Sequence, residues 1–243
     1  FTMKLKKIAS LMLAGVMAVS MLTACGGNTI DDTQKPEEPD VTPSTSASAQ
    51  TLVSNMSKKA QNMVTAVSNG DLDAALKSAV EDYFSNADVV KYGSMFEIDQ
   101  KAYGKGQNDA RDTDIGEALV TNLKPYTTEI SKLNNLTDDK TDPFTAVEVY
   151  GVNGSVTDKD VLEQLGHKIT QSVEELDTEG TINGDNKDQS NVAKYVDFDY
   201  EVSVSIVTAN GRVWGIDDTV KFVAVAVTRT GTVETGLSDN SKI

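Results

Sequence analysis

The chain has 243 residues, of which 37 are acidic and 22 basic, for a formal net charge of −15. Such a surface repels polyanions, so nucleic acid, teichoic acid and anionic lipid headgroups are poor candidate partners: each needs a cluster of Lys and Arg to neutralise its phosphates. The single cysteine excludes an intramolecular disulfide.

The N-terminal residues are typical of an export signal. Three lysines between Lys4 and Lys7 precede an apolar run from Ile8 to Leu22, which is followed by small residues. A membrane-spanning helix needs about 20 apolar residues, so this run has the length of a signal-peptide core instead. Removing residues 1–24 on export would remove three lysines and no acid, which takes the formal charge from −15 to −18.

The tetrapeptide Leu22-Thr23-Ala24-Cys25 resembles the lipobox of bacterial lipoproteins. The resemblance implies that a diacylglyceryl group alkylates the thiol of Cys25 and that the bond after Ala24 is then cut. Each buried methylene contributes about 0.8 kcal/mol, so the two or three acyl chains of such a protein hold it on the membrane. The resemblance therefore implies a lipid-anchored protein on the extracytoplasmic face of the cell membrane.

A tether is predicted to follow the lipidated residue. Residues 25–50 are rich in Asp, Glu, Pro, Ser and Thr and contain almost no large apolar side chain. Such a composition cannot bury enough surface to fold, and a flexible coil of this length reaches about 25 to 30 Å. Residues 51–243 are then expected to form a single globular domain.

Two helical patterns open that domain. The first is predicted to end near Asn69-Gly70, and the second to begin at once with Asp71 as its cap. A glycine turn between adjacent helices favours a tightly packed helix pair. The apolar stripes recur at spacings of three and four, at Leu52, Met56, Ala60, Met63 and Val67, and then at Leu72, Ala75, Leu76, Ala79, Val80 and Tyr83.

The middle of the chain alternates loops with regular elements. Residues 93–112 are predicted to be a loop, and a helical pattern then runs from Ile115 to Leu133. Pro125 removes a backbone hydrogen bond from the middle of that pattern, so a break is expected before it. Residues 134–143 indicate a polar turn and residues 146–152 a strand.

A further helix is predicted from Thr157 to near Asp177. Thr157 and Asp160 have the spacing of a capping box, and apolar residues follow at helical spacing. The only histidine, His167, falls with Glu163 on the polar side of this helix. It is therefore predicted to be a surface side chain with no catalytic or ligating role.

The strongest pattern is a strand from Val196 to Ile206, in which apolar residues alternate with acids and serines. A two-residue turn at Asn210-Gly211 would put Trp214 on the acidic face of that strand. A three-residue loop with Gly211 in the left-handed region would instead place Trp214 opposite Ile206, and burial favours this second register.

Residues 220–228 are apolar at odd and even positions alike, which is typical of a strand covered on both faces. In the favoured register Trp214 is predicted to pack in the core or between the sheet and a helix, and the alternative is the wall of a pocket.

Helices first and strands last predict an α+β fold, with helices covering one face of a C-terminal antiparallel meander. The run Asn69-Gly70-Asp71-Leu72-Asp73-Ala74-Ala75-Leu76, followed by long strands, resembles the nuclear-transport-factor-like cone fold found in many envelope lipoproteins. The resemblance implies a domain that encloses a pocket and implies no site residues. The helix predicted at 157–177 departs from that pattern, because the family usually has sheet there.

The sequence contains no phosphate-binding loop, nucleophile elbow, zinc signature or Cys/His pair, and no cofactor is expected. Carboxylates remain as candidate groups. Two acidic groups could bind calcium, but neither has the spacing of an EF-hand loop, so solvated loops are favoured. They are Asp109, Asp112 and Asp114, and Asp177, Glu179, Asn183, Asp185 and Asp188.

The leading hypothesis is a non-enzymatic envelope lipoprotein whose domain binds a small ligand or another envelope protein. A closed, apolar-lined cavity beside Trp214 would favour it. The alternative is a carboxylate-dependent hydrolase of cell-wall or dietary glycans, which needs an open groove with two carboxyls about 5 to 10 Å apart. A purely structural surface protein would have no pocket.

Overall fold

The computed structural model describes residues 46–98, 114–125, 127–134, 141–182, 194–214 and 216–233, all within one unit that extends from Thr42 to Ile243. The predicted signal, Ala24 and Cys25 lie outside the described residues. The first described helix begins at Ala47, inside the segment predicted to be the tether, and Ser46 caps it. No helix among the described residues is both long and apolar enough to cross a bilayer.

Helices and strands together confirm the α+β class. The helices are α1 (Ala47–Ser54), α2 (Lys58–Met63), α3 (Gly70–Tyr83), α4 (Asn86–Tyr92), α5 (Asp114–Leu123), the 3-10 helix η1 (Ile130–Asn134) and α6 (Asp158–Glu174). The strands are β1 (Val64–Ala66), β2 (Phe144–Asn153), β3 (Glu179–Ile182), β4 (Lys194–Val213) and β5 (Ile216–Val233).

One sheet contains all five of these strands, in the order β1-β4-β5-β2, with β3 also paired to β4. The long β4–β5 hairpin forms its centre, in an unbroken antiparallel register from Val196 opposite Val233 to Val213 opposite Ile216. The antiparallel pairing of β4 with β5 confirms the C-terminal part of the predicted meander. Strand β2 is antiparallel to β5 as well, whereas β1 adds a short parallel strand beside β4. The sheet is therefore mixed.

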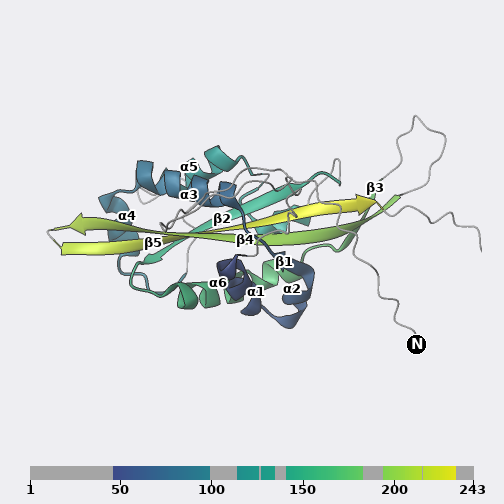
Figure 1. The fold of residues 1–243 in the computed structure, drawn as a ribbon, viewed down its shortest axis with the longest axis horizontal. Helices are drawn as coiled ribbons and strands as arrows, with labels where there is room; N and C mark the ends of the chain where they lie inside the picture. Colours follow the sequence, from purple (N-terminus) through teal and green to yellow (C-terminus); the bar gives the residue numbers. More distant parts are fainter. Residues whose placement is uncertain are drawn as a thin grey trace, which may run out of the picture. The chain divides into compact units, whose positions relative to one another are not determined.

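Helices cover both faces of the sheet, so the prediction of one covered face is wrong. Figure 1 shows α1, α2 and α6 on one side of the sheet and α3, α4 and α5 on the other, and each group has its own apolar core. The reason lies in β5, where every residue from Val220 to Val227 is buried. The prediction that this strand is covered on both faces is confirmed.

The predicted helix pair is also wrong. The first helix stops at Ser54, and Ser57 starts α2 by accepting a hydrogen bond from the N–H of Ala60. The chain then becomes β1, which pairs with Tyr200–Val202 at the edge of the sheet. Strand β1 lies between α2 and α3 in the chain and at the edge of the sheet. The chain passes around this edge from one face to the other, so α2 and α3 pack on opposite faces. Asn69, rather than Asp71, caps α3.

The other helix predictions are confirmed where the residues are described. Helix α5 ends at Leu123, before Pro125, and Lys124 has a positive φ of 48°. Thr157 caps α6 through its hydroxyl, which accepts a bond from the N–H of Asp160. His167 is exposed on that helix, as predicted.

The predicted hairpin register is wrong. Strand β4 continues through Asn210-Gly211 to Val213, so Ile206 pairs with Val223 instead of Trp214. Trp214 lies in the turn with a φ of 50° and is 92 % exposed, neither in the core nor in a pocket wall. Helices α3 and α4 pack on the distal part of β4, which stabilises the extended strand where the Asn-Gly pair alone predicts a turn.

Candidate functional site

Strand β4 has an outer edge that is only partly paired. On the side away from β5, strand β3 pairs with Lys194–Asp197 and β1 pairs with Tyr200–Val202. Beyond Val202, no strand among the described residues pairs with this edge. The remaining edge is the candidate functional site, and we call the segment from Ser203 to Gly211 the open edge. Ser203, Val204 and Ser205 are buried, so its accessible part runs from Ile206 to Gly211.

The backbone groups that face outward on the open edge follow from two hydrogen bonds. The carbonyl of Val202 accepts from the N–H of Val67 at 2.9 Å, and the N–H of Phe198 donates to the carbonyl of Thr178 at 2.9 Å. Successive residues of a strand present their N–H and C=O groups to opposite sides, and the register with β5 has no bulge. The N–H and C=O groups of Ile206, Thr208 and Asn210 therefore face outward.

A groove runs along the open edge beneath α3. It is a hollow of about 590 Å³, and four consecutive strand residues line it. Side chains alternate between the two faces of a strand, so only its backbone edge brings four consecutive residues to one hollow. We call this hollow the edge groove; its lining residues are Lys77, Val80, Glu81 and Phe84 of α3 and its end, and Ile206, Val207, Thr208 and Ala209 of β4.

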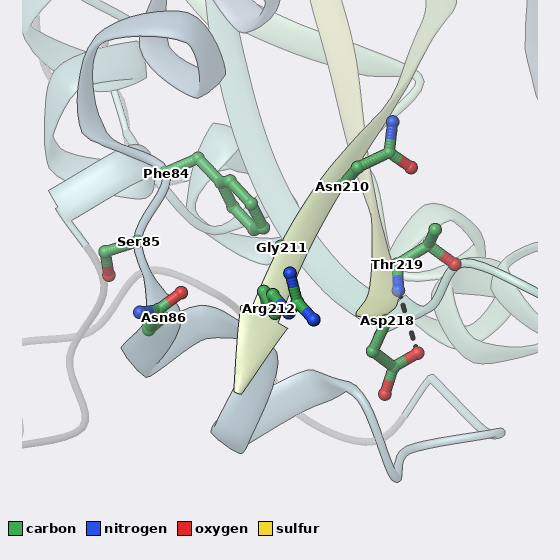
Figure 2. A pocket seen from close by; sticks show the side chains of 8 residues that line it. All are labelled: Phe84, Ser85, Asn86, Asn210, Gly211, Arg212, Asp218 and Thr219. Atoms are coloured by element: carbon green, nitrogen blue, oxygen red, sulfur yellow. Dashed lines mark hydrogen bonds between the residues drawn. The ribbon is translucent and has the colours of Figure 1, made fainter. Parts of the chain in front are cut away.

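A second hollow, of about 780 Å³, continues from the edge groove and shares Phe84 with it. Figure 2 shows Phe84, Ser85 and Asn86 on one side of the end of β4, and Asp218 and Thr219 on the other. Asn210, Gly211 and Arg212 of β4 complete the lining. Asp218 is held in place, because its Oδ1 accepts a hydrogen bond from the N–H of Thr219 at 2.8 Å.

The charges around the two hollows balance. Lys77 and Glu81 line the edge groove 3.7 Å apart, and Arg212 and Asp218 line the second hollow. The open edge itself has no charged residue from Ser203 to Gly211, in a chain with a net charge of −15. Natural proteins usually protect exposed strand edges with charges, prolines or bulges, so an uncharged, regular edge favours pairing with another strand.

The end of the β4–β5 hairpin carries the most exposed large apolar side chains. Trp214 is 92 % exposed and Ile216 is 69 % exposed. Trp214 lines neither hollow. A side chain this exposed does not line a closed cavity, so the observation that would have favoured ligand binding beside Trp214 is not made.

Buried polar groups elsewhere in the sheet have structural roles. Arg229 donates to the carbonyl of Leu133 at 3.0 Å, and its guanidinium lies 4.3 Å from the centre of the Phe198 ring. The hydroxyl of Tyr200 donates to the carbonyl of Asp177 at 2.6 Å. Burial raises the pKa of Tyr200, Arg229 lowers it and Asp177 raises it, and together they bring it to about 12. These bonds tie η1 and the end of α6 to the sheet.

A second buried pair lies on β2. The Tyr150 hydroxyl donates to Glu148, and the other carboxylate oxygen of Glu148 accepts from the N–H of Ile130 at 3.1 Å. Burial raises the pKa of Tyr150 well above its usual range, and the charge of Glu148 raises it further. Both side chains are enclosed by the core, so they are out of reach of a substrate.

The two acidic groups considered for calcium, and interpreted as solvated loops, lie mostly outside the described residues. These are Asp109, Asp112, Asn183, Asp185 and Asp188, together with the side chain of Asp114. Asp177 and Glu179 are described and exposed. Within the described ranges, no three His, Cys, Asp or Glu side chains are grouped so that they could hold a metal ion.

Sequence reasoning missed the open edge, because the alternating pattern of β4 does not tell which strands lie beside it. The uncharged run from Ser203 to Gly211 was the available signal. Comparison of the chain with protein-family models, curated proteins and solved structures finds no match. The lipobox and the cone-fold resemblance stay predictions.

Proposed function

We propose that this protein is a non-enzymatic lipoprotein, anchored on the extracytoplasmic face of the membrane, whose domain binds a segment of protein as an additional strand. One observation carries the proposal: the N–H and C=O groups of Ile206, Thr208 and Asn210 face outward beside a groove, with no strand of the described chain paired to them. Strand addition uses main-chain hydrogen bonds for affinity and side-chain hollows for specificity.

The edge groove supplies both requirements. An incoming strand would bond to the outward groups of β4, and its alternate side chains would enter the hollow lined by Val80 and Phe84. Ile206 and Val207 are only partly buried, so the added strand would cover apolar surface on both faces of the sheet. The second hollow, with Arg212 and Asp218, would receive the polar end of the bound segment.

Lipid anchoring through Cys25 would favour such binding. Confinement to one membrane surface raises the effective concentration of two anchored or membrane-bound partners, so a modest strand-pairing affinity is sufficient. An acidic surface outside the groove would keep the protein soluble and reject polyanions.

Site-specific photo-crosslinking in intact cells tests this proposal. A photoreactive side chain at Asn210, which is exposed on the open edge, should give a covalent adduct, and the same probe at Thr232, exposed on β5, should not. Thr208→Pro removes one outward N–H without breaking the β4–β5 ladder and should abolish the adduct at Asn210. Thr208→Ala keeps that N–H and should retain it. Equal adducts at Asn210 and Thr232, or an adduct that survives Thr208→Pro, would contradict strand addition.

The hydrolase alternative has one supporting feature, since Glu81 and Asp218 are carboxylates in adjoining hollows. However, Glu81 is 63 % exposed and faces Lys77, and Asp218 accepts a backbone bond. Neither has the apolar surroundings of a general acid. Glycan hydrolysis that is lost in both Glu81→Gln and Asp218→Asn would favour this alternative.

A further inference from the structure

We propose that the end of the β4–β5 hairpin inserts into the lipid surface on which the protein is anchored, with Trp214 as the leading side chain. We call residues 212–217 the hairpin tip. Figure 1 shows this end of the hairpin beyond α4, at one end of the sheet. The inference rests on the lipid anchor of the proposed function and does not depend on strand addition.

Trp214 occupies a turn position that usually has a different type of residue. Val213 pairs with Ile216, so the turn has two central residues, and Trp214 is the first of them, with a φ of 50°. Turns of this length favour Asn, Asp or Gly, because a bulky side chain is strained at positive φ. Packing does not explain the tryptophan either, since its side chain is almost fully exposed. A strained and exposed aromatic residue favours a role in binding.

The hairpin tip projects beyond the part of the sheet that α4 covers. Val89 of α4 packs against Gly211, and a Cβ added at Gly93, which follows α4, would meet the carboxylate of Asp218. Gly211 and Asp218 are opposite each other in the hairpin. Three further residues lead from Gly211 to Trp214, which is a projection of about 10 Å. Both large apolar side chains described in the tip, Trp214 and Ile216, are mostly exposed.

The hairpin tip is electrically neutral in an acidic chain. No acidic residue lies between Glu201 and Asp217, and Arg212 is opposite Asp217 in the hairpin register. The formal charge of the tip is therefore zero, whereas that of the whole chain is −15. Charges are screened over about 8 Å in physiological salt, so a tip that projects about 10 Å can meet a bilayer while the acidic body is screened from it. Insertion of an indole also needs no basic cluster, because it does not neutralise phosphate.

The exposed apolar area of the tip fits a lipid surface better than a protein partner. The side chains of Trp214 and Ile216 could bury roughly 300 Å² together. A stable protein–protein interface buries about 800 Å² on each partner. A bilayer requires no complementary pocket, because an indole ring lies among the lipid headgroups with its N–H still hydrated. The tip therefore has the size of a membrane contact.

The predicted tether is long enough for the anchor and the hairpin tip to reach the same bilayer. A flexible coil from Cys25 to Ser46 would span about 25 Å. Ser46 caps α1, which lies near the middle of β4 in Figure 1, and half of this strand measures about 33 Å. Because these lengths are similar, the lipid on Cys25 would hold the tip close to the bilayer. That confinement raises the effective concentration, so weak insertion is sufficient.

Tryptophan fluorescence on vesicles tests the insertion. The chain from Cys25 to Ile243 has one thiol and one tryptophan, so Cys25 can be coupled to a maleimide lipid in phosphatidylcholine vesicles while Trp214 is observed directly. We expect the emission to shift to the blue, and iodide quenching to fall at least twofold, relative to the same chain with its thiol blocked. Brominated phosphatidylcholine, which quenches an indole that contacts the bilayer, should quench Trp214 in the coupled chain.

Matched variants separate insertion from mere proximity. Ile216→Glu would force a charge into the bilayer surface and should reduce quenching by brominated lipid at least twofold. Thr232→Glu adds the same charge at an exposed position far along β5 from the tip and should retain the quenching. The double variant Trp214→Ser/Thr232→Trp moves the indole away from the tip and should not be quenched. Circular dichroism would establish that each variant is folded.

Two results would overturn the inference. One is an unchanged Trp214 emission and iodide quenching on coupled vesicles, and the other is equal lipid quenching after the indole is moved to position 232. A photoreactive probe at position 214 that forms a protein adduct in cells, without lipid quenching, would instead assign the tip to a protein partner. Chemical coupling replaces natural lipidation, so failure of insertion is distinct from failure of the anchor, which Cys25→Ser tests, and of strand addition, which crosslinking at Asn210 tests.

Discussion

The side chain of Val89 packs against the backbone of Gly211. A Cβ added at Gly211 would overlap Cγ2 of Val89, which is buried, and would lie 3.2 Å from two atoms of the Phe84 ring. The glycine therefore serves close packing of β4 against α4 and the end of α3. This explains why Asn210-Gly211, a common turn signal, lies inside a strand.

Gly211→Ala should destabilise the domain by about 1 to 3 kcal/mol, because Val89 and Phe84 would have to move. Gly70→Ala is the matched control: a Cβ at Gly70 meets no atom within 4 Å, and the residue starts α3. It should leave stability unchanged or raise it by up to about 1 kcal/mol. Urea unfolding of both variants measures the difference, and equal midpoints would contradict the packing argument.

Trp214 should fluoresce as a water-exposed indole. It is the only tryptophan, so emission excited selectively from tryptophan, and not from the seven tyrosines, reports the hairpin turn alone. We expect little red shift on unfolding and efficient quenching by iodide in the folded state. A blue-shifted, poorly quenched emission would instead indicate that this side chain is covered.

Stability should fall at alkaline pH because of Tyr200. Its pKa is about 12 in the folded protein and about 10 in the unfolded chain, so the unfolded state loses its proton first as the pH rises. The contribution is fully present below pH 10 and is lost between about pH 10 and 12. Thermal melts of the natural chain and of Tyr200→Phe, taken from pH 8 to 11, should show a shallower alkaline loss in the variant.

Cys25→Ser should leave the precursor unprocessed and without lipid. The thiol of Cys25 is the predicted acceptor of the diacylglyceryl group, and the cut after Ala24 is predicted to follow that modification. Metabolic labelling with a fatty acid and the mass of the chain measure both steps. Normal maturation of the variant would refute the lipobox.

Local signals predicted the elements whose causes are themselves local. Thr157 caps α6, Pro125 follows the end of α5, and the apolar residues from Phe222 to Val227 form part of a strand buried on both faces. The capping hydroxyl of a threonine, the N–H that a proline lacks and an unbroken apolar run each affect only residues a few positions away. No distant part of the chain was needed to read them.

The sequence by itself determined the α+β class and the outward-facing His167. It also predicts the anchor at Cys25. Only the tertiary structure decided the exposed position of Trp214, the separation of α2 and α3 on opposite faces, and the open edge of β4. Each of these depends on contacts between residues far apart in the chain. Two such contacts outweighed the local preference of the residues involved. Val89 packs on Gly211, where the sequence predicts a turn, and β1 pairs with Tyr200–Val202, where the sequence predicts a helix.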